Sequence, residues 1–125
     1  MNYSIKTAEK FKLPIAAQSR SWDLGAENVI ARMAFTISLE MEEPISMDEM
    51  LDSKGKEYPS KVLFGEYQSV YEGMLSQRES LPVSHPDFKK LVKCHVDRGL
   101  DRLLAHSSMD LSQVVDFFSE PEQNH

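Results

Sequence analysis

The amino-acid sequence predicts a mainly helical fold that opens with one short strand. Two long segments, 26–41 and 85–105, repeat apolar residues at the three- and four-residue spacing of helices that bury one face. Residues 2–6 instead alternate, with Tyr3 and Ile5 on one face, as in a strand. At 125 residues and 41% hydrophobic content, the chain is long enough for one domain with its own core.

The segment after the strand, residues 7–22, predicts a broken first helix. Pro14 lies within it, and a proline inside a helix removes one backbone hydrogen bond and kinks or restarts the helix. A turn follows at residues 23–25, where Gly25 is free to take a positive φ. The expected buried residues of this segment are Ala8, Phe11, Ile15 and Trp22.

Residues 26–41 predict the second helix. Glu27 stands in its first turn, where a carboxylate interacts favourably with the helix dipole. Residues 42–60 contain two prolines, a glycine and mixed charge, and indicate a long loop of the kind that often binds a partner. The apolar stripe expected on the second helix is Val29, Ile30, Met33, Ala34, Ile37 and Met41.

A third helix is expected over residues 65–79 and a fourth from the stretch SHPD, at 84–87, to about Ala105. Ser84 is the expected N-cap of the fourth helix, with Asp87 at the capping-box position. The buried sides are predicted to be Tyr67, Val70, Tyr71, Met74 and Leu75 on the third helix, and Phe88, Leu91, Val92, His95, Gly99 and Leu103 on the fourth.

The end of the chain predicts a short fifth helix over residues 110–118 and then a polar segment. We expect residues 1–118 to form a single helical domain, and the acidic tail 119–125 to be disordered. The N-terminal half, one short strand followed by two helices, has the element order of a ribbon-helix-helix half. Because a single strand cannot satisfy its own hydrogen bonds, this order predicts pairing with a second chain.

Charge is unevenly distributed along this acidic chain, whose net charge is −6. Residues 21–60 hold nine acids against three bases, so any contact with DNA must come from a local basic patch or depend on partners. Two basic clusters suit sequence-independent phosphate contacts, one near the N-terminus and one along the fourth helix. The candidate DNA-binding residues are Lys6, Lys10, Lys12, Arg20, Lys89, Lys93 and Arg98.

Several function classes lack support in the sequence. Cys94 and His95 are adjacent, so on a helix they point about 100° apart and do not form an activated thiolate pair. The histidines lack metal-ligand spacing, and the chain has no phosphate-binding glycine loop, so we expect no metal and no cofactor. No apolar run is long enough for a membrane span or a secretory signal, and we expect a cytoplasmic protein.

The stretch LFGEY, at 63–67, has two interpretations. In the structural one, Leu63 and Phe64 anchor the chain, Gly65 permits an unusual φ, and Glu66 favours the dipole of the third helix. In the functional one, Glu66 acts as an acid or base, or holds an arginine such as Arg78 or Arg98. We favour the structural interpretation.

Three stretches together resemble the DndE family of bacterial DNA sulfur-modification (phosphorothioation) proteins. They are NVIARMAFTISL at 28–39, LFGEYQSVYEGMLSQR at 63–78 and HVDRGLDRLL at 95–104, and the similarity extends over roughly residues 3–105. The residues of this chain that carry it are Arg32, Leu63, Phe64, Gly65, Glu66, Tyr67, Arg78 and Gly99.

The resemblance implies a noncatalytic, ribbon-helix-helix-like homotetramer that binds duplex DNA, with a preference for nicked DNA. It implies action beside the DndC and DndD subunits and a cysteine desulfurase, which replace a non-bridging phosphate oxygen with sulfur. Those partners carry the iron–sulfur and nucleotide chemistry. The acidic loop 40–57 of this chain is then expected to face a basic partner subunit.

Two other functions remain open at this stage. One is an enzyme, such as a DNA nickase, that uses Glu66, Tyr67 and Arg78. The other is a ribbon-helix-helix transcription regulator, whose stretch YSIKT, at 3–7, would enter the major groove.

Overall fold

The computed structural model describes residues 2–105 of the chain, and these are mainly helical, as predicted. The expected helix 110–118 and tail 119–125 lie outside the described residues. The elements follow in the order β1 (Ser4–Lys6), η1 (Glu9–Phe11), α1 (Lys12–Ser21), α2 (Glu27–Glu40), η2 (Met47–Glu49), β2 (Glu57–Pro59), α3 (Ser60–Phe64), η3 (Gly65–Tyr67), α4 (Gln68–Glu79) and α5 (Phe88–Leu104), where η denotes a short 3-10 helix.

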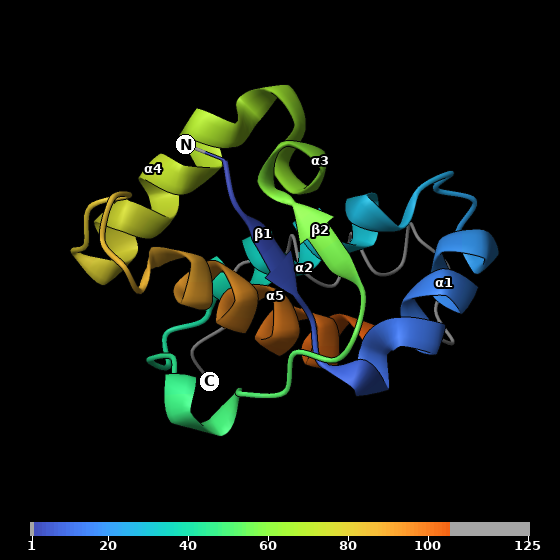
Figure 1. Ribbon diagram of the computed structural model, residues 1–125. Helices are drawn as coiled ribbons and strands as arrows, with labels where there is room; N and C mark the ends of the chain where they lie inside the picture. Colours follow the sequence, from blue (N-terminus) through green and yellow to red (C-terminus); the bar gives the residue numbers. More distant parts are fainter. Residues whose placement is uncertain (1, 106–125) are drawn as a thin grey trace, which may run out of the picture.

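Helix α5 is the centre of the fold. In Figure 1 it runs behind the small β1–β2 sheet and in front of α2, while α4 and α1 lie on opposite sides. Residues 91–97 of α5 are all buried, because the helix is covered on more than one face. Every residue of its predicted apolar stripe is buried, which confirms the helical spacing identified in the sequence.

The sheet forms within one chain, and this corrects the expectation that the first strand pairs with a second chain. Strands β1 and β2 are antiparallel, with Ile5 opposite Tyr58 and both side chains buried. Strand β2 lies inside segment 42–60, which we expected to be only a loop. A strand of three residues that ends at Pro59 is too short to show the alternation of apolar and polar side chains that identifies a strand in a sequence. The central side chain of β2 is buried because the strand pairs with β1.

The break predicted in the first helix is confirmed. The short helix η1 precedes α1, and Pro14 is the third residue of α1. The N–H groups of a first helical turn have no partner within the helix, so proline is tolerated there. The residues predicted to be buried around this break, including Phe11 and Ile15, are buried.

The third predicted helix, 65–79, forms as η3 followed by α4, but its buried side differs from the prediction. The preceding helix α3 was not predicted, and Gly65, with a φ of 64° and a ψ of −148°, turns the chain directly after it. The buried face of α4 carries the polar Glu72, whose carboxylate accepts a hydrogen bond from the Tyr3 hydroxyl, so apolar spacing did not identify that face. Leu75 is buried as expected and Tyr71 is half-buried, but Tyr67, Val70 and Met74 are exposed.

Helix α5 begins later than predicted. Its N-cap is Asp87, without a side-chain cap, so the expected Ser84 capping box is wrong. The Asp87 N–H instead donates to His85 Nδ1 over 3.1 Å, which satisfies that amide outside the helix. Turns through residues 82–88 therefore replace the first predicted helical turn.

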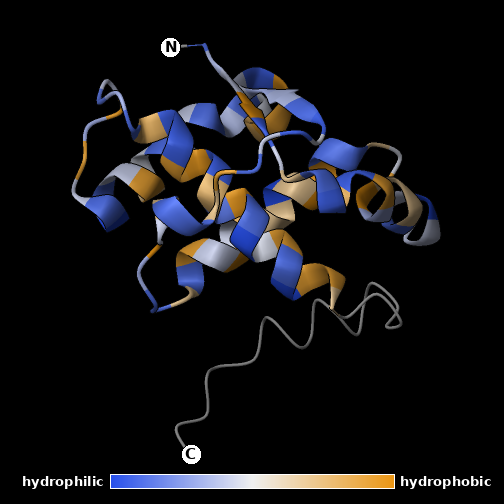
Figure 2. Ribbon diagram, turned by 60° about the horizontal axis from the view of Figure 1, so that its bottom comes forward, coloured by the Kyte–Doolittle hydropathy of each residue, from blue (hydrophilic) through white to orange (hydrophobic). Residues whose placement is uncertain are grey.

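The helices carry both polar and apolar residues along their length, as Figure 2 shows by colour. This distribution is typical of helices that bury one face and expose the other. Among the described residues, no helix is long and apolar enough to span a membrane.

Candidate nucleic-acid interface

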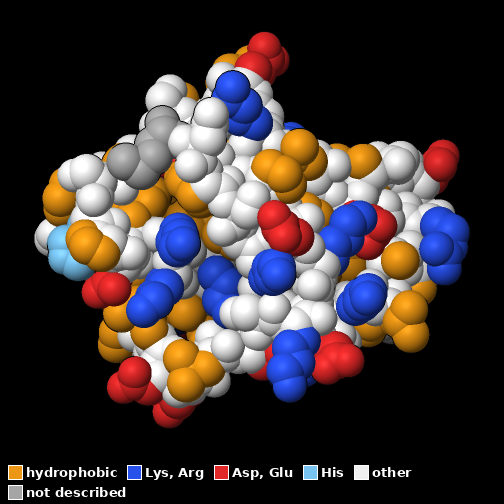
Figure 3. Space-filling view, in the orientation of Figure 1, with side chains coloured by type: hydrophobic (Ala, Val, Ile, Leu, Met, Phe, Trp, Pro, Cys, Tyr) orange, Lys and Arg blue, Asp and Glu red, His pale blue; other side chains and the backbone are white. Residues whose placement is uncertain are grey.

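Five of the seven candidate DNA-binding residues have exposed side chains. They come from β1, α1 and α5, together with the short helix that precedes α1. Figure 3 shows Lys and Arg side chains spread over the face that carries the sheet and α5, with Asp and Glu between them. The exposed candidates are Lys6, Lys10, Lys12, Arg20 and Lys89.

Two of the exposed lysines already lie near carboxylates. Lys6 Nζ is 3.9 Å from Glu57 Oε1, and Lys10 Nζ is 3.4 Å from Asp101 Oδ1. Ion pairs this exposed contribute little to stability and exchange readily for other partners. These lysines can turn to a phosphate, although the neighbouring acids reduce the positive potential around them.

Lys93 is buried, unlike the exposed candidates. Its ammonium bonds to Asp97 Oδ2 one turn along α5, and both side chains are less than a tenth exposed. Asp97 Oδ1 accepts a hydrogen bond from the Ala8 N–H over 3.1 Å, which attaches the start of η1 to α5. Lys93 therefore neutralises a buried carboxylate, so we remove it from the proposed DNA contacts.

Arg98 is also committed to an internal contact. Its guanidinium donates to Ser38 O over 2.7 Å, to Ser38 Oγ over 2.8 Å and to Glu43 O over 2.6 Å. Ser38 is two residues before the end of α2, where carbonyls lack partners within the helix. A cation there also interacts favourably with the helix dipole. Arg98 thus caps α2, and we remove it from the proposed DNA contacts too.

Arg78 binds the same end of α2. It donates to Leu39 O and Glu43 O, each over 3.0 Å. Burial and the nearby Arg78 charge lower the pKa of Arg98, while Glu43 and Glu79 act in the opposite direction. Among the described residues Glu66 makes no ion pair with either arginine, the alternative left open under the functional interpretation, since Glu66 lies before α4 and Arg78 lies near the C-terminal end of that helix.

A serine, a histidine and a glutamate meet beside this cap. Ser38 Oγ is 2.8 Å from His95 Nδ1, and His95 Nε2 is 3.6 Å from Glu79 Oε2. Because Arg98 donates to Ser38 Oγ, the serine hydroxyl can donate its proton to Nδ1, which leaves the ring proton on Nε2. Burial, Arg98 and Arg78 lower the pKa of His95 to about 3, so the ring is neutral at pH 7 and its contact with Glu79 is not an ion pair.

This trio does not form an accessible nucleophilic site. Ser38 and His95 are both fully buried. A nucleophile must be reached by its substrate, and the hydroxyl of Ser38 is enclosed between α2 and α5. The Ser38–His95 hydrogen bond joins α2 to α5, and Glu79 of α4 lies beside the ring.

The LFGEY stretch is built around Arg32. The Arg32 guanidinium donates to Leu63 O over 2.7 Å and to Val62 O over 3.2 Å, at the end of α3. A Cβ added at Gly65 would lie 3.2 Å from Arg32 Nη2, and the positive φ of this glycine also disfavours a side chain. The structural interpretation of this stretch therefore fits the geometry, with Leu63 and Phe64 buried and Glu66 and Tyr67 exposed.

The structure does not bring together the three residues on which the enzyme hypothesis depends. Glu66 and Arg78 are separated by nearly the whole of α4, roughly 18 Å of helical rise over twelve residues. Tyr67 is 61% exposed and lies in η3, at the Glu66 end of that helix. A nickase that brings all three side chains together would require a different fold of this segment.

Other potentially reactive side chains within residues 2–105 are also buried or do not cluster. Cys94 is buried, and burial raises the pKa of its thiol to about 11, so it is not an activated thiolate. These residues contain no cluster of three or more histidine, cysteine or acidic side chains that could hold a metal ion.

The sequence also matches a known protein family over most of its length. The family model for the DNA sulphur modification protein DndE matches residues 4–110. The chain belongs to the DndE family. A search of curated proteins found no match.

Membership of the DndE family gives the chain a role in DNA sulphur modification. It also explains which residues carried the resemblance. Arg32, Arg78, Gly65 and Gly99 all lie where helices end or cross, so the family signature in this chain describes a fold more than a reactive centre. Sequence reasoning missed the helix-capping role of the arginines, since their acceptors lie 30 to 60 residues away along the chain.

Proposed function

We propose that this DndE-family chain is a noncatalytic subunit that binds the DNA backbone and helps to assemble the phosphorothioate modification complex in the cytoplasm. The observation that carries the proposal is the family match over residues 4–110. The proposed partners are duplex or nicked DNA and the DndC and DndD subunits, which would carry out the sulfur chemistry.

The accessible surface supports a role in positioning DNA. Lys12 and Lys89 are exposed, and neither forms an ion pair with another described residue. Such lysines can neutralise phosphates without reading sequence. Acidic residues lie between the basic ones on the same face (Figure 3), so the proposed contact involves few phosphates. We expect partner subunits to increase the affinity for DNA.

The proposal also includes a homotetramer, and an exposed apolar surface supports self-association. We define the α4 patch as four side chains on α3, η3 and α4 that remain 38–61% exposed: Val62, Tyr67, Val70 and Met74. Val70 and Met74 lie one turn apart on the same face of α4, and Tyr67 directly precedes this helix. Exposed large apolar side chains that gather on a surface often mark a protein interface.

The central test measures DNA binding by fluorescence anisotropy. A labelled nicked duplex is titrated with the protein at several salt concentrations, alone and with DndC and DndD present. We expect affinity to fall as salt rises, and Lys12→Gln and Lys89→Gln each to reduce the slope of log affinity against log salt by about one.

Lys61→Gln is the matched control, because it removes the same charge from an exposed residue outside the candidate set. The control should keep the wild-type slope. Absence of binding at low salt, even with the partner subunits present, would reject the DNA contact. Equal effects of all three substitutions would reject these particular lysines.

A further inference from the structure

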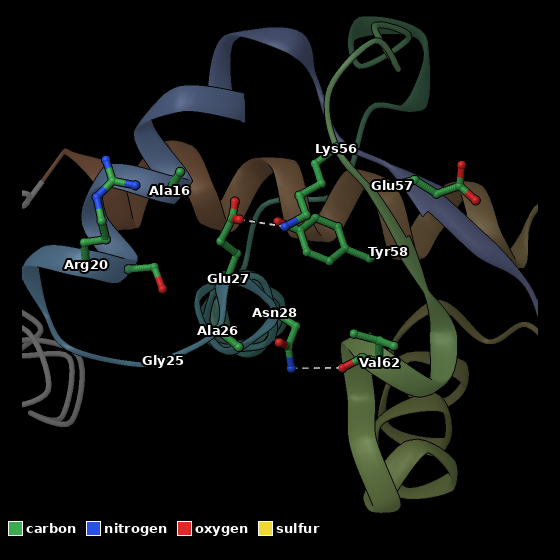
Figure 4. A pocket seen from close by; sticks show the side chains of 11 residues that line it. Ala16, Arg20, Gly25, Ala26, Glu27, Asn28, Lys56, Glu57, Tyr58 and Val62 are labelled. Atoms are coloured by element: carbon green, nitrogen blue, oxygen red, sulfur yellow. Dashed lines mark hydrogen bonds and ion pairs between the residues drawn. The ribbon is translucent and has the colours of Figure 1, made fainter.

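A pocket of about 340 Å³ opens at the N-terminal end of α2. It lies between the end of α1, the first turn of α2 and strand β2, as Figure 4 shows. Its wall includes Arg20, Glu27, Asn28, Lys56 and Tyr58. The volume is at the small end of the range for ligand sites, which suits a small polar group.

The start of α2 presents hydrogen-bond donors that have no partner. The helix has no side-chain cap, and its N-cap residue, Ala26, has no side chain that could supply one. Among residues 2–105, the backbone N–H groups of Glu27 and Asn28 make no hydrogen bond. Free amides at the positive end of a fourteen-residue helix are suited to an anion.

Tyr58 supplies an independent sign of a missing ligand. The residue is 2% exposed, and its hydroxyl has no hydrogen-bond partner among the described residues. In Figure 4 the hydroxyl end of the ring lies beside the Glu27–Lys56 pair at the pocket. Burial and the Glu27 carboxylate raise the pKa of Tyr58, so its hydroxyl keeps the proton that it could donate.

One cation at the pocket wall has no ion-pair partner among the described residues. Lys56 Nζ lies 2.6 Å from Glu27 Oε2, whereas Glu57 has only an exposed contact of 3.9 Å with Lys6. Arg20 is exposed at the pocket wall and makes no ion pair with another described residue. Its guanidinium can bind two oxygens of one phosphate.

We propose that this pocket binds a single phosphate group through the Glu27 and Asn28 amides, the Arg20 guanidinium and the Tyr58 hydroxyl. Lys56 adds positive charge at its edge. The group could be a phosphate of a DNA backbone or a free phosphate. The assignment of the phosphate to DNA rests on the proposed function, whereas the phosphate site itself does not depend on that function.

The test uses amide NMR of the full chain with two probes, inorganic phosphate and a short duplex. Inorganic phosphate is expected to shift the Glu27 and Asn28 amides in a saturable way, and the duplex to shift the same two amides. Arg20→Gln is expected to weaken phosphate binding about tenfold, because it removes a charged donor. Tyr58→Phe breaks no hydrogen bond among the described residues, so it should weaken binding while the fold is retained.

Lys90→Gln is the control for charge, since Lys90 is exposed on α5 and does not line the pocket. Weaker phosphate binding in Arg20→Gln or Tyr58→Phe, with Lys90→Gln unchanged, supports the site. Unshifted Glu27 and Asn28 amides with both probes overturn it, as does equal weakening in all three variants.

The two proposals can fail separately. If the duplex binds and shifts other amides only, the phosphate pocket is rejected as a DNA contact while the proposed function stands. If phosphate shifts the two amides but no duplex binds, the pocket stands and the DNA-binding function is rejected.

Discussion

Gly99 lies where α5 meets α2, and the lack of a side chain is what allows the contact. A Cβ added at Gly99 would lie 1.7 Å from the carbonyl oxygen of Ala34, far inside van der Waals contact. Both atoms belong to the backbone or its first carbon, so no side-chain rotation relieves the overlap. The two central helices can pack at this distance only with glycine at this position.

Gly99→Ala should therefore lower the free energy of unfolding by about 3 kcal/mol or more, because α2 and α5 must separate. Gly73→Ala is the matched control, as Gly73 is also helical and an added Cβ would touch nothing within 4 Å. That variant should be more stable by about 0.5–1 kcal/mol, through helix propensity alone. Urea unfolding measures both, and similar effects at the two glycines would contradict the close approach.

Carbonyl groups at the C-terminal ends of α2 and α3 accept hydrogen bonds from arginines that lie far away in the sequence. Arg32 binds the end of α3, while Arg78 and Arg98 bind the end of α2 and the carbonyl of Glu43 beyond it. Each guanidinium offers several donors in a fixed plane and carries the charge that the helix C-terminus favours. The same residues therefore satisfy the ends of the helices, and Arg78 and Arg98 also hold the start of segment 42–60 at Glu43.

Arg98→Gln should lower the free energy of unfolding by roughly 2–3 kcal/mol, because a charged donor to three acceptors is lost. Lys89→Gln, on the exposed side of the same helix, should change it by less than about 0.5 kcal/mol. Chemical denaturation distinguishes the two roles. A stable Arg98→Gln protein that had lost DNA binding would restore Arg98 to the DNA contacts.

At the scale of the whole molecule, the α4 patch predicts self-association. Val70→Glu places a charge in the centre of the patch and should reduce the oligomer mass measured by light scattering. Leu13→Glu is the control, since Leu13 is 79% exposed on α1, outside the patch. Equal masses for Val70→Glu and the wild type would place the interface elsewhere, and a wild-type mass of one chain would reject the tetramer.

Much of the helical architecture could be predicted because it depends on local spacing. The stripe on α5 and the buried residues around Pro14 follow from helical periodicity, and the structure confirms them. The exposure of Tyr67 and Val70 could not be predicted in this way. The buried face of α4 carries the polar Glu72, whose carboxylate accepts a hydrogen bond from the Tyr3 hydroxyl, so apolar spacing alone selects the wrong face.

The candidate site was only partly predictable. Lys93 has Asp97 at the i,i+4 spacing that the sequence shows, but its burial depends on a distant segment, the start of η1, whose Ala8 N–H donates to Asp97. Arg98 likewise appears as a surface cation until its acceptors in α2 are placed beside it. The burial of Lys93 and the acceptors of Arg98 depend on contacts between distant segments, and spacing along the chain does not specify such contacts.

The sequence by itself determined the helical class, the break near Pro14 and the motifs that indicate the DndE family, because these depend on neighbouring residues or on their order. Only the tertiary structure decided that β1 pairs with β2 in the same chain and that Arg98 caps α2. It alone brought Arg20, Lys56 and Tyr58 to the start of α2. The physical reason is that hydrogen bonds, charge pairs and pockets form between groups that folding brings together from distant parts of the chain.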